Sequence, residues 1–190
     1  MQGSIIVGQS GGPTAVINSS LAGVVKTAKD RGAKKIYGML HGIQGFLDEK
    51  YVDLSDSIQT ELDIEILKRT PSAYLGSCRY KLPEIHENTE IYERIFAMLN
   101  KLDVECFIYI GGNDSMDTIR KLSDYAIVKG YPQKFVGVPK TIDNDLWGTD
   151  MTFGFQSAVD IATQTIDCIH TTAASHNRVF IIELMGHKVG

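Results

Sequence analysis

Cysteine, tryptophan and long apolar runs are all scarce in this sequence. It has only three cysteines, Cys78, Cys106 and Cys168, which are far apart and form no CxxC pair. An odd number of scattered cysteines is typical of reduced thiols rather than disulfides. No apolar run approaches the roughly 20 residues that span a bilayer, and the start, Met1 to Ser4, does not resemble a secretory leader. We therefore expect a cytoplasmic protein with no membrane partner.

An excess of basic residues is also missing. The formal net charge is −4, which argues against a nucleic-acid partner but not against a small anionic substrate held by a few local donors. The sequence contains neither G-x-G-x-x-G nor G-x-x-x-x-G-K-[ST], so the usual dinucleotide and P-loop signatures are absent. The five histidines show no spacing typical of zinc ligands.

Short apolar runs alternate with longer segments of helical periodicity. This alternation predicts right-handed βαβ crossovers and a doubly wound, mostly parallel α/β sheet with helices on both faces. The predicted strands are 5–8, 35–39, 106–110, 135–138 and 179–184. The predicted helices are 15–29, 84–100, 115–128 and 154–170.

The end of the sequence and the domain organisation give two further expectations. The chain stops soon after its last predicted strand with no closing helix, which favours a truncated fold, an N-terminal fragment of a longer protein. We expect one part of the fold over residues 1–150 and the start of a second, truncated part over residues 151–190.

Three glycine-rich or polar segments follow predicted strands, at the edge where such sheets bind ligands. In the first, Gln9 to Asn18, Gly11 and Gly12 allow backbone amides to approach an anion at a helix N-terminus. A tight turn without a ligand also fits this segment alone.

The second segment, Gly111 to Ser115, also precedes a helix, and a simple helix cap explains it equally well when taken alone. However, Asp114 adds a negative charge near a phosphate cradle. Two like charges about 4 Å apart cost roughly 4 kcal/mol at an effective dielectric near 20. We interpret Asp114 as a device that excludes one additional phosphate.

The third segment, Pro139 to Asp145, gives the sharpest prediction. It places Lys140, Thr141, Asp143 and Asp145 within six residues. Phosphoryl transfer to an alcohol needs a carboxylate that accepts the hydroxyl proton and cations that neutralise the moving group. Asp143 is the candidate base, Lys140 the cation and Asp145 a magnesium-side carboxylate, although a polar turn remains an alternative. Arg79 and Arg178 are candidate phosphate clamps.

Taken together, these segments resemble the phosphofructokinase family. The resemblance runs from Ile5 to Gly186 and rests on the order of the blocks SGGPTAVIN, YLGSCR, GGNDS, PKTIDND, GFQSA, SHNR and ELMG. It implies a doubly wound fold and Mg²⁺-assisted transfer of phosphate to O1 of fructose 6-phosphate in glycolysis. It also implies that residues 1–150 bind the phosphoryl donor and that residues 151–190 begin a sugar-phosphate-binding half. It further implies a homo-oligomer in which Arg178 reaches a neighbouring subunit's sugar phosphate.

The resemblance also implies roles for individual residues. The donor-binding set is Gly11, Gly12, Arg79, Gly112 and Ser115, and the catalytic set is Asp143, Lys140 and Asp114. The substrate-binding set is Thr141, Asp143, Arg178, Met185, Gly186 and His187, and the metal-side pair is Asn113 and Asp145. Asn113 departs from an Asp that many relatives carry, and His187 departs from the usual Arg.

Asp114 and Lys140 match the family members that use pyrophosphate, whereas ATP users resemble GGDGS and PGTIDND. We therefore expect a pyrophosphate-dependent phosphofructokinase. The alternatives are an ATP-dependent enzyme of the same family and a non-catalytic regulatory phosphate-binding subunit, which the changes at Asn113 and His187 would suit. The isolated chain is expected to have little or no activity, because half of the sugar site would be missing.

Overall fold

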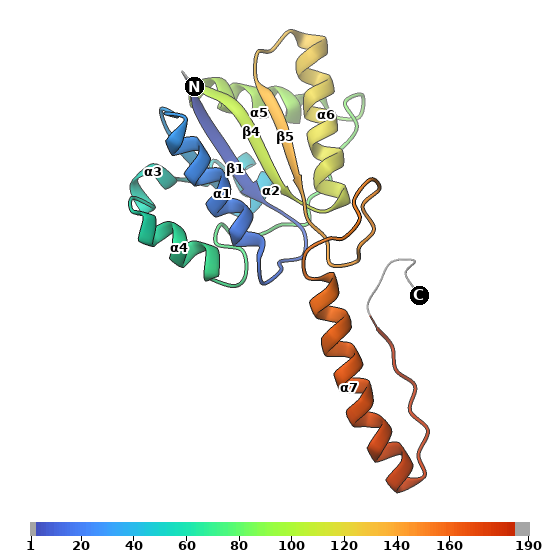
Figure 1. The fold of residues 1–190 in the computed structure, drawn as a ribbon. Coiled ribbons are helices and arrows are strands. Elements are labelled where there is room, and N and C mark those ends of the chain that lie inside the picture. The colour runs from blue at the N-terminus through green and yellow to red at the C-terminus, as the bar shows by residue number, and fades with distance from the viewer. Residues whose placement is uncertain (1–2, 185–190) are drawn as a thin grey trace. The chain divides into compact units, whose positions relative to one another are not determined.

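A computed structural model describes residues 3–184 of the chain (Figure 1). The chain divides into two compact units, which join in sequence between Lys140 and Thr141. Each unit is described by itself. This division lies ten residues before the predicted functional boundary at residue 150, and the assignment of donor and sugar-phosphate binding to the two parts stays a prediction.

The first unit is built on a five-stranded sheet with the order β3-β2-β1-β4-β5. β1 pairs in parallel with both β2 and β4, and β4 pairs in parallel with β5, whereas the short edge strand β3 is antiparallel to β2. The predicted mostly parallel sheet is therefore confirmed. The strand bounds are β1 Ser4–Gln9, β2 Ile36–Met39, β3 Tyr51–Asp53, β4 Val104–Gly111 and β5 Lys134–Pro139.

Helices cover both faces of this sheet, because alternate residues of the strands bury against different helices. In β1, Ile6 packs with the core formed by α2, α5 and α6, whereas Ile5 and Val7 pack with α1, α3 and α4. The sheet is thus the middle layer of the fold. The helix bounds are α1 Ile17–Asp30, α2 Gly42–Leu47, α3 Leu54–Ser57, α4 Glu61–Arg69, α5 Thr89–Lys101 and α6 Asn113–Lys129.

The start of α5 differs from the sequence-based prediction. The periodicity predicted a helix from Glu84, but α5 begins at Thr89. The side chain of Asn88 accepts a hydrogen bond from the backbone N–H of Ile91, which caps the helix there. The preceding residues form a turn in which Glu84 N–H donates to the Glu87 carboxylate. Local capping therefore decides the boundary.

The second unit contains α7, Phe155–His176, which extends six residues beyond the predicted end at His170. Asn177, in the left-handed conformation, ends it. The predicted strand 179–184 is wrong, because these residues form no strand, and Val179 and Ile181 are 94% and 98% exposed. An apolar run becomes a strand only when a neighbour pairs its backbone groups, and within residues 3–184 none does.

Two further observations concern the chain as a whole. The three cysteines are free, with Cys78 buried and Cys168 exposed. No helix between residues 3 and 184 is both long and apolar enough to cross a bilayer.

The core position of α1 makes a testable prediction. Leu21→Ala removes a completely buried side chain from the core beneath α1. We expect it to lower the free energy of unfolding by about 2–5 kcal/mol, as large-to-small core substitutions do. Urea denaturation followed by circular dichroism measures the change. Leu62→Ala, a chemically identical change on α4 at a side chain 68% exposed, is the control and should shift stability by less than about 0.5 kcal/mol.

Candidate functional site

The candidate site lies at the carboxyl ends of β1 and β4. These strands are neighbours in the sheet, but the chain leaves β1 toward β2 and leaves β4 toward β5, on opposite sides. Such a divergence is the topological switch point where open α/β sheets bind ligands. Ser10 N–H donates to the Ile110 carbonyl at 2.9 Å, so the two loops begin side by side. The first two predicted segments are therefore brought together.

Glycine is required at two positions of these loops for different reasons. A Cβ on Gly111 would lie 2.1 Å from the Ser115 hydroxyl oxygen, which the fold cannot accommodate without moving. Gly11 has a φ of +76°, a conformation that residues with a side chain rarely adopt. Apart from its own chain neighbours, no atom of residues 3–184 lies within 4 Å of the Cβ that a side chain at Gly12 would add, so the space beside it is open. An open glycine turn at a strand end allows close approach by a phosphate.

Lys140 brings a positive charge to the glycine turn from the end of β5. Its backbone N–H donates to the Gly111 carbonyl at 2.8 Å, and its ammonium donates to the Gly12 carbonyl. A Cβ on Gly11 would lie 3.5 Å from this ammonium. Lys140 is only 5% exposed. In the first unit, the cation of Lys140 therefore lies at the turn after β1, and its role in phosphoryl transfer stays a prediction.

The first turn of α6 supplies the remaining donor-side residues. Asn113 and Asp114 are exposed there, whereas Ser115 is buried. The helix N-terminus carries a partial positive charge that favours an anion, and Asp114 places a carboxylate at the same position. The backbone N–H groups of this turn therefore favour a bound anion, whereas the Asp114 carboxylate disfavours any negative charge close to it.

The segment before Arg79 is fastened to the glycine turn. The Cys78 carbonyl accepts hydrogen bonds from Gly11 N–H at 2.9 Å and from the Ser10 hydroxyl at 3.3 Å, and the Ser77 hydroxyl donates to the Gly11 carbonyl. Arg79 itself is exposed. Its position next to Cys78 places it beside the loop that its predicted role requires.

Sequence reasoning did not single out the buried amides that hold this segment in place. Gln9 donates to Asn18 and accepts from Leu75 N–H, while Asn18 accepts from Tyr74 N–H and donates to the Thr70 carbonyl. Both side chains are completely buried. Buried amides need such partners to avoid a desolvation penalty. The available signal was an Asn on the otherwise apolar face of α1.

The second unit carries the other predicted residues. Asp143 N–H donates to the Thr141 hydroxyl at 3.1 Å, whereas Asp143 Oδ1 is buried and has no hydrogen-bond partner in the described part of the chain. Asn144, in a left-handed conformation, accepts hydrogen bonds from Thr152 that close the turn. Arg178, past the end of α7, is exposed. The predicted sugar contacts at Met185, Gly186 and His187 lie outside the described residues.

The two predicted metal-side residues, Asn113 and Asp145, belong to different units. Among residues 3–184 no group of three or more His, Cys, Asp or Glu side chains is placed to hold a metal ion. Mg²⁺ usually takes one or two protein oxygens and completes its shell with substrate phosphates and water. The side-chain oxygens of Asn113 and Asp145 are of the type that Mg²⁺ binds when substrate phosphates and water supply its other ligands.

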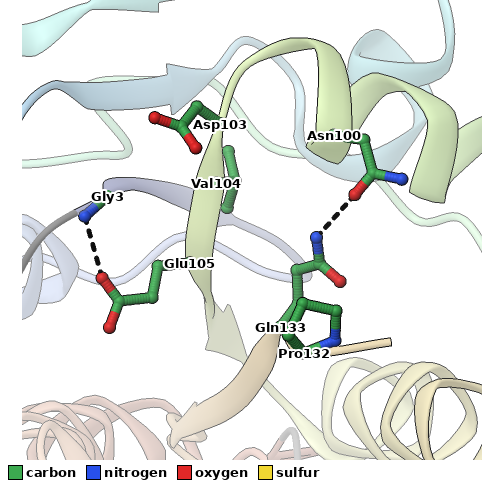
Figure 2. A pocket seen from close by; sticks show the side chains of 7 residues that line it. All are labelled: Gly3, Asn100, Asp103, Val104, Glu105, Pro132 and Gln133. Carbon is green, nitrogen blue, oxygen red and sulfur yellow. Dashed lines mark hydrogen bonds between the residues drawn. The ribbon is translucent and has the colours of Figure 1, made fainter. Parts of the chain in front are cut away.

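A separate cavity of about 470 Å³ lies at the other end of the strands, near the starts of β1, β4 and β5 (Figure 2). Its lining includes Glu105, which accepts from Gly3 N–H, and Gln133, which donates to Asn100. The side chains that line it are carboxylates, amides and apolar groups, with no cation to receive a phosphate. The cavity is therefore distinct from the glycine loops.

The fold and the loops define a doubly wound α/β protein with glycine turns and a buried lysine at its switch point. The phosphofructokinase family model matches residues 4–190. The chain therefore belongs to the phosphofructokinase family, as the sequence blocks predicted.

Individual relatives agree with this assignment but differ in the donor that they name. The pyrophosphate–fructose 6-phosphate 1-phosphotransferase of Xanthomonas campestris is 42% identical over 99% of this chain and 45% of the relative. The ATP-dependent 6-phosphofructokinase 3 of Bacteroides thetaiotaomicron is 36% identical over 95% of this chain and 52% of the relative. The chain thus spans about half the length of the curated relatives it matches.

Solved structures agree on the fold. The pyrophosphate-dependent phosphofructokinase from Nitrosospira multiformis superposes with a TM-score of 0.80 at 39% identity. The match covers 90% of this chain and 42% of that one. The predicted doubly wound architecture is confirmed by this similarity as well as by the sheet itself.

The crowding at Gly111 predicts a specific loss of stability. Gly111→Ala would force the Ser115 side chain and the Ser10 carbonyl away from the new methyl group. We expect a loss of about 1–3 kcal/mol in the free energy of unfolding, the usual range for overpacking. Gly23→Ala on α1, where the new methyl group meets nothing within 4 Å, is the matched control. It should stabilise the protein by about 0.5–1 kcal/mol in the same denaturation experiment.

Proposed function

We propose that the chain is the N-terminal part of a pyrophosphate-dependent 6-phosphofructokinase, which transfers a phosphoryl group from pyrophosphate to fructose 6-phosphate. The observation that carries this proposal is the buried ammonium of Lys140 at the glycine turn, at the same sheet edge as Asp114. The cation favours a phosphoryl group within the cradle, and the carboxylate opposes the additional phosphate of a nucleotide. Relatives that carry the pyrophosphate-dependent name support this choice.

In the proposed reaction, Asp143 accepts the proton of the sugar O1 hydroxyl as that oxygen attacks the transferred phosphorus. The bond between this phosphorus and the bridging oxygen of pyrophosphate breaks, so fructose 1,6-bisphosphate and inorganic phosphate are the products. Asp143 Oδ1 is a buried acceptor with no hydrogen-bond partner among residues 3–184. A buried acceptor is normally satisfied, and a substrate hydroxyl would satisfy this one. Thr141, which accepts a hydrogen bond from Asp143 N–H, steadies the turn.

The remaining groups of the proposed site neutralise and orient the phosphates. The donor is contacted by the backbone of Gly11, Gly12 and Gly112, by Ser115 and by Arg79. Mg²⁺ with Asn113 and Asp145 would offset the charge that develops on the phosphates. Arg178, Met185, Gly186 and His187 contribute to sugar-phosphate binding, in part across a homo-oligomer interface, and the protein acts in the cytoplasm.

Donor choice is tested by a donor-swap assay on the full-length protein. Pyrophosphate should support formation of fructose 1,6-bisphosphate, and ATP should not. Replacing both Asp114 and Lys140 with Gly should lower kcat/KM for pyrophosphate by about a hundredfold or more. The reason is the loss of the Lys140 ammonium, whose attraction to a phosphate charge about 4 Å away is worth roughly 4 kcal/mol at an effective dielectric near 20. The same replacement should let ATP serve as donor.

Asp114→Asn is the matched control for this experiment, because it removes the charge but keeps the shape. It should admit ATP only in part if bulk as well as charge excludes the nucleotide. Turnover by the unaltered protein with ATP alone would contradict the pyrophosphate assignment in favour of the ATP-dependent alternative. Relatives with ATP-dependent names at 36–38% identity make this the specific competing outcome.

The role of Asp143 is tested separately. Asp143→Asn keeps the side-chain volume but removes the base, so kcat should fall about 10²- to 10⁴-fold, with KM for pyrophosphate little changed. Asp150→Asn, at an exposed position of the same loop region, is the control and should retain activity. Unchanged turnover by Asp143→Asn would remove the proposed base. The absence of turnover by the unaltered full-length protein with either donor would instead favour a regulatory subunit. The 190-residue chain alone should show little or no turnover.

A further inference from the structure

Residues 79–83 have no regular structure, although they include the proposed donor contact Arg79. They belong to no helix or strand, and none of the backbone–backbone hydrogen bonds of the described chain involves them. Their path is therefore set by what holds them at each end. At the start, the Cys78 carbonyl is bonded to Gly11 and Ser10 at the glycine turn.

The far end of this segment is held by one buried lysine of α6. Lys121 is 2% exposed, and its ammonium donates to the Leu82 carbonyl at 2.9 Å. The same ammonium lies 2.8 Å from the Glu84 carboxylate and 2.9 Å from the Asp117 carboxylate. Tyr92 adds a second anchor, because its hydroxyl donates to the Pro83 carbonyl at 2.6 Å. Only three residues, Arg79 to Lys81, lie between the anchored Cys78 and Leu82 carbonyls.

The burial of Lys121 is fully compensated. An ammonium loses its hydration on burial and needs hydrogen-bond acceptors in return. The hydrogen bonds that its ammonium donates to the carboxylates of Glu84 and Asp117 raise the pKa of Lys121 above its ordinary value. The lysine therefore stays charged, with one carbonyl and two carboxylates directed at its three protons.

Lys121 also relates the segment to the donor site. It lies two turns after Asp114 on α6, the helix whose first turn faces the proposed phosphate cradle. A helix is a rigid element, so a hydrogen bond from its third turn to Leu82 fixes the segment relative to the helix N-terminus. The opposite anchor, at Cys78, fixes it relative to the turn after β1. Arg79 is thus placed with respect to both loops of the cradle.

We infer that Lys121 is a positioning residue for the phosphoryl-donor site, holding the Arg79 segment so that its guanidinium meets the pyrophosphate. The inference rests on the proposed function for the role of Arg79. The bracing of the segment does not depend on it. Without the Lys121 ammonium, the Leu82 carbonyl loses its partner and residues 79–82 are held only at Cys78 and at Pro83. Arg79 then spends most of its time away from the donor.

The brace is tested first without reference to activity. Arg79 and Lys81 are exposed and provide two trypsin sites inside the segment. Lys121→Met keeps an apolar stem of similar length but removes the ammonium, so cleavage after Arg79 and Lys81 should accelerate about tenfold or more, as expected when an anchored backbone becomes free to open locally. Lys129→Met, the same change at an exposed position eight residues further along α6, is the matched control and should leave the cleavage rate unchanged.

The positioning role is then tested by a double-mutant cycle in the full-length enzyme. Lys121→Met should raise KM for pyrophosphate about tenfold, within the 10²-fold range that a misplacement of about 1 Å can cost. KM for fructose 6-phosphate should remain unchanged. In an Arg79→Ala background, Lys121→Met should add little to the KM for pyrophosphate, since both changes remove the same contact. If Lys121 only stabilised the fold, Lys121→Met and Arg79→Ala would act additively on KM for pyrophosphate. The KM values for pyrophosphate and fructose 6-phosphate would then change equally.

Tyr92→Phe provides a second variant if Lys121→Met does not fold. It removes only the hydroxyl bonded to Pro83 and should give a smaller change in the same direction in trypsin cleavage and in KM for pyrophosphate. Unaccelerated cleavage in both variants overturns the inference, as does a KM for pyrophosphate that changes additively with Arg79→Ala. Either result, with an active unaltered enzyme, leaves the proposed function intact. An unaltered protein inactive with pyrophosphate and with ATP indicates failure of the proposed function itself.

Discussion

The buried ammonium of Lys140 is the interaction on which the site in the first unit depends. Burying a positive charge is costly unless hydrogen bonds replace its hydration, and the Gly12 carbonyl supplies one of them. The backbone N–H of the same residue is bonded to Gly111. One lysine at the end of β5 therefore joins the loops that follow β1 and β4. Glycine is needed in both loops for separate reasons, because a side chain at position 111 would displace Ser115 and one at position 11 would strain a backbone with a φ of +76°.

A second constraint acts around this centre through side chains rather than through a backbone ladder. Between α4 and α5 the chain runs for many residues without a helix or strand. Its path is set by the Gln9–Asn18 amides on one side and by Lys121 and Tyr92 on the other. The central sheet fixes the strand ends, and buried polar side chains then fix the irregular segment against them. The sheet and these buried side chains together give the segment between α4 and α5, which has no helix or strand, a defined position.

Most of the fold was predictable because its signals are local. Buried β-branched runs such as Ile5–Gly8 and the helical periodicity of α1 and α6 depend only on neighbouring residues, and the loops follow from glycine at strand ends. The start of α5 was not predictable from periodicity, because the cap at Asn88 interrupts an apolar pattern that continues through Ile85. The strand expected at 179–184 failed because its apolar run has no pairing partner in the described chain. The roles of Gln9, Asn18 and Lys121 could not be read from the sequence, since their partners lie far away along it.

The pairing of β1 with β4 has a consequence for how the chain is made. β1 is central in the sheet, yet its partner β4 lies about a hundred residues further along, with Ile5 opposite Cys106 (Figure 1). At typical synthesis rates, a ribosome needs roughly 5–20 s to add a hundred residues. During that interval β1 can pair only with β2, which leaves its other edge open to the cell. Within this sheet β1 is made before the other strands, yet its second edge stays unpaired until β4 is made. An unpaired strand edge is a site of self-association, so this edge is the exposed one during that interval.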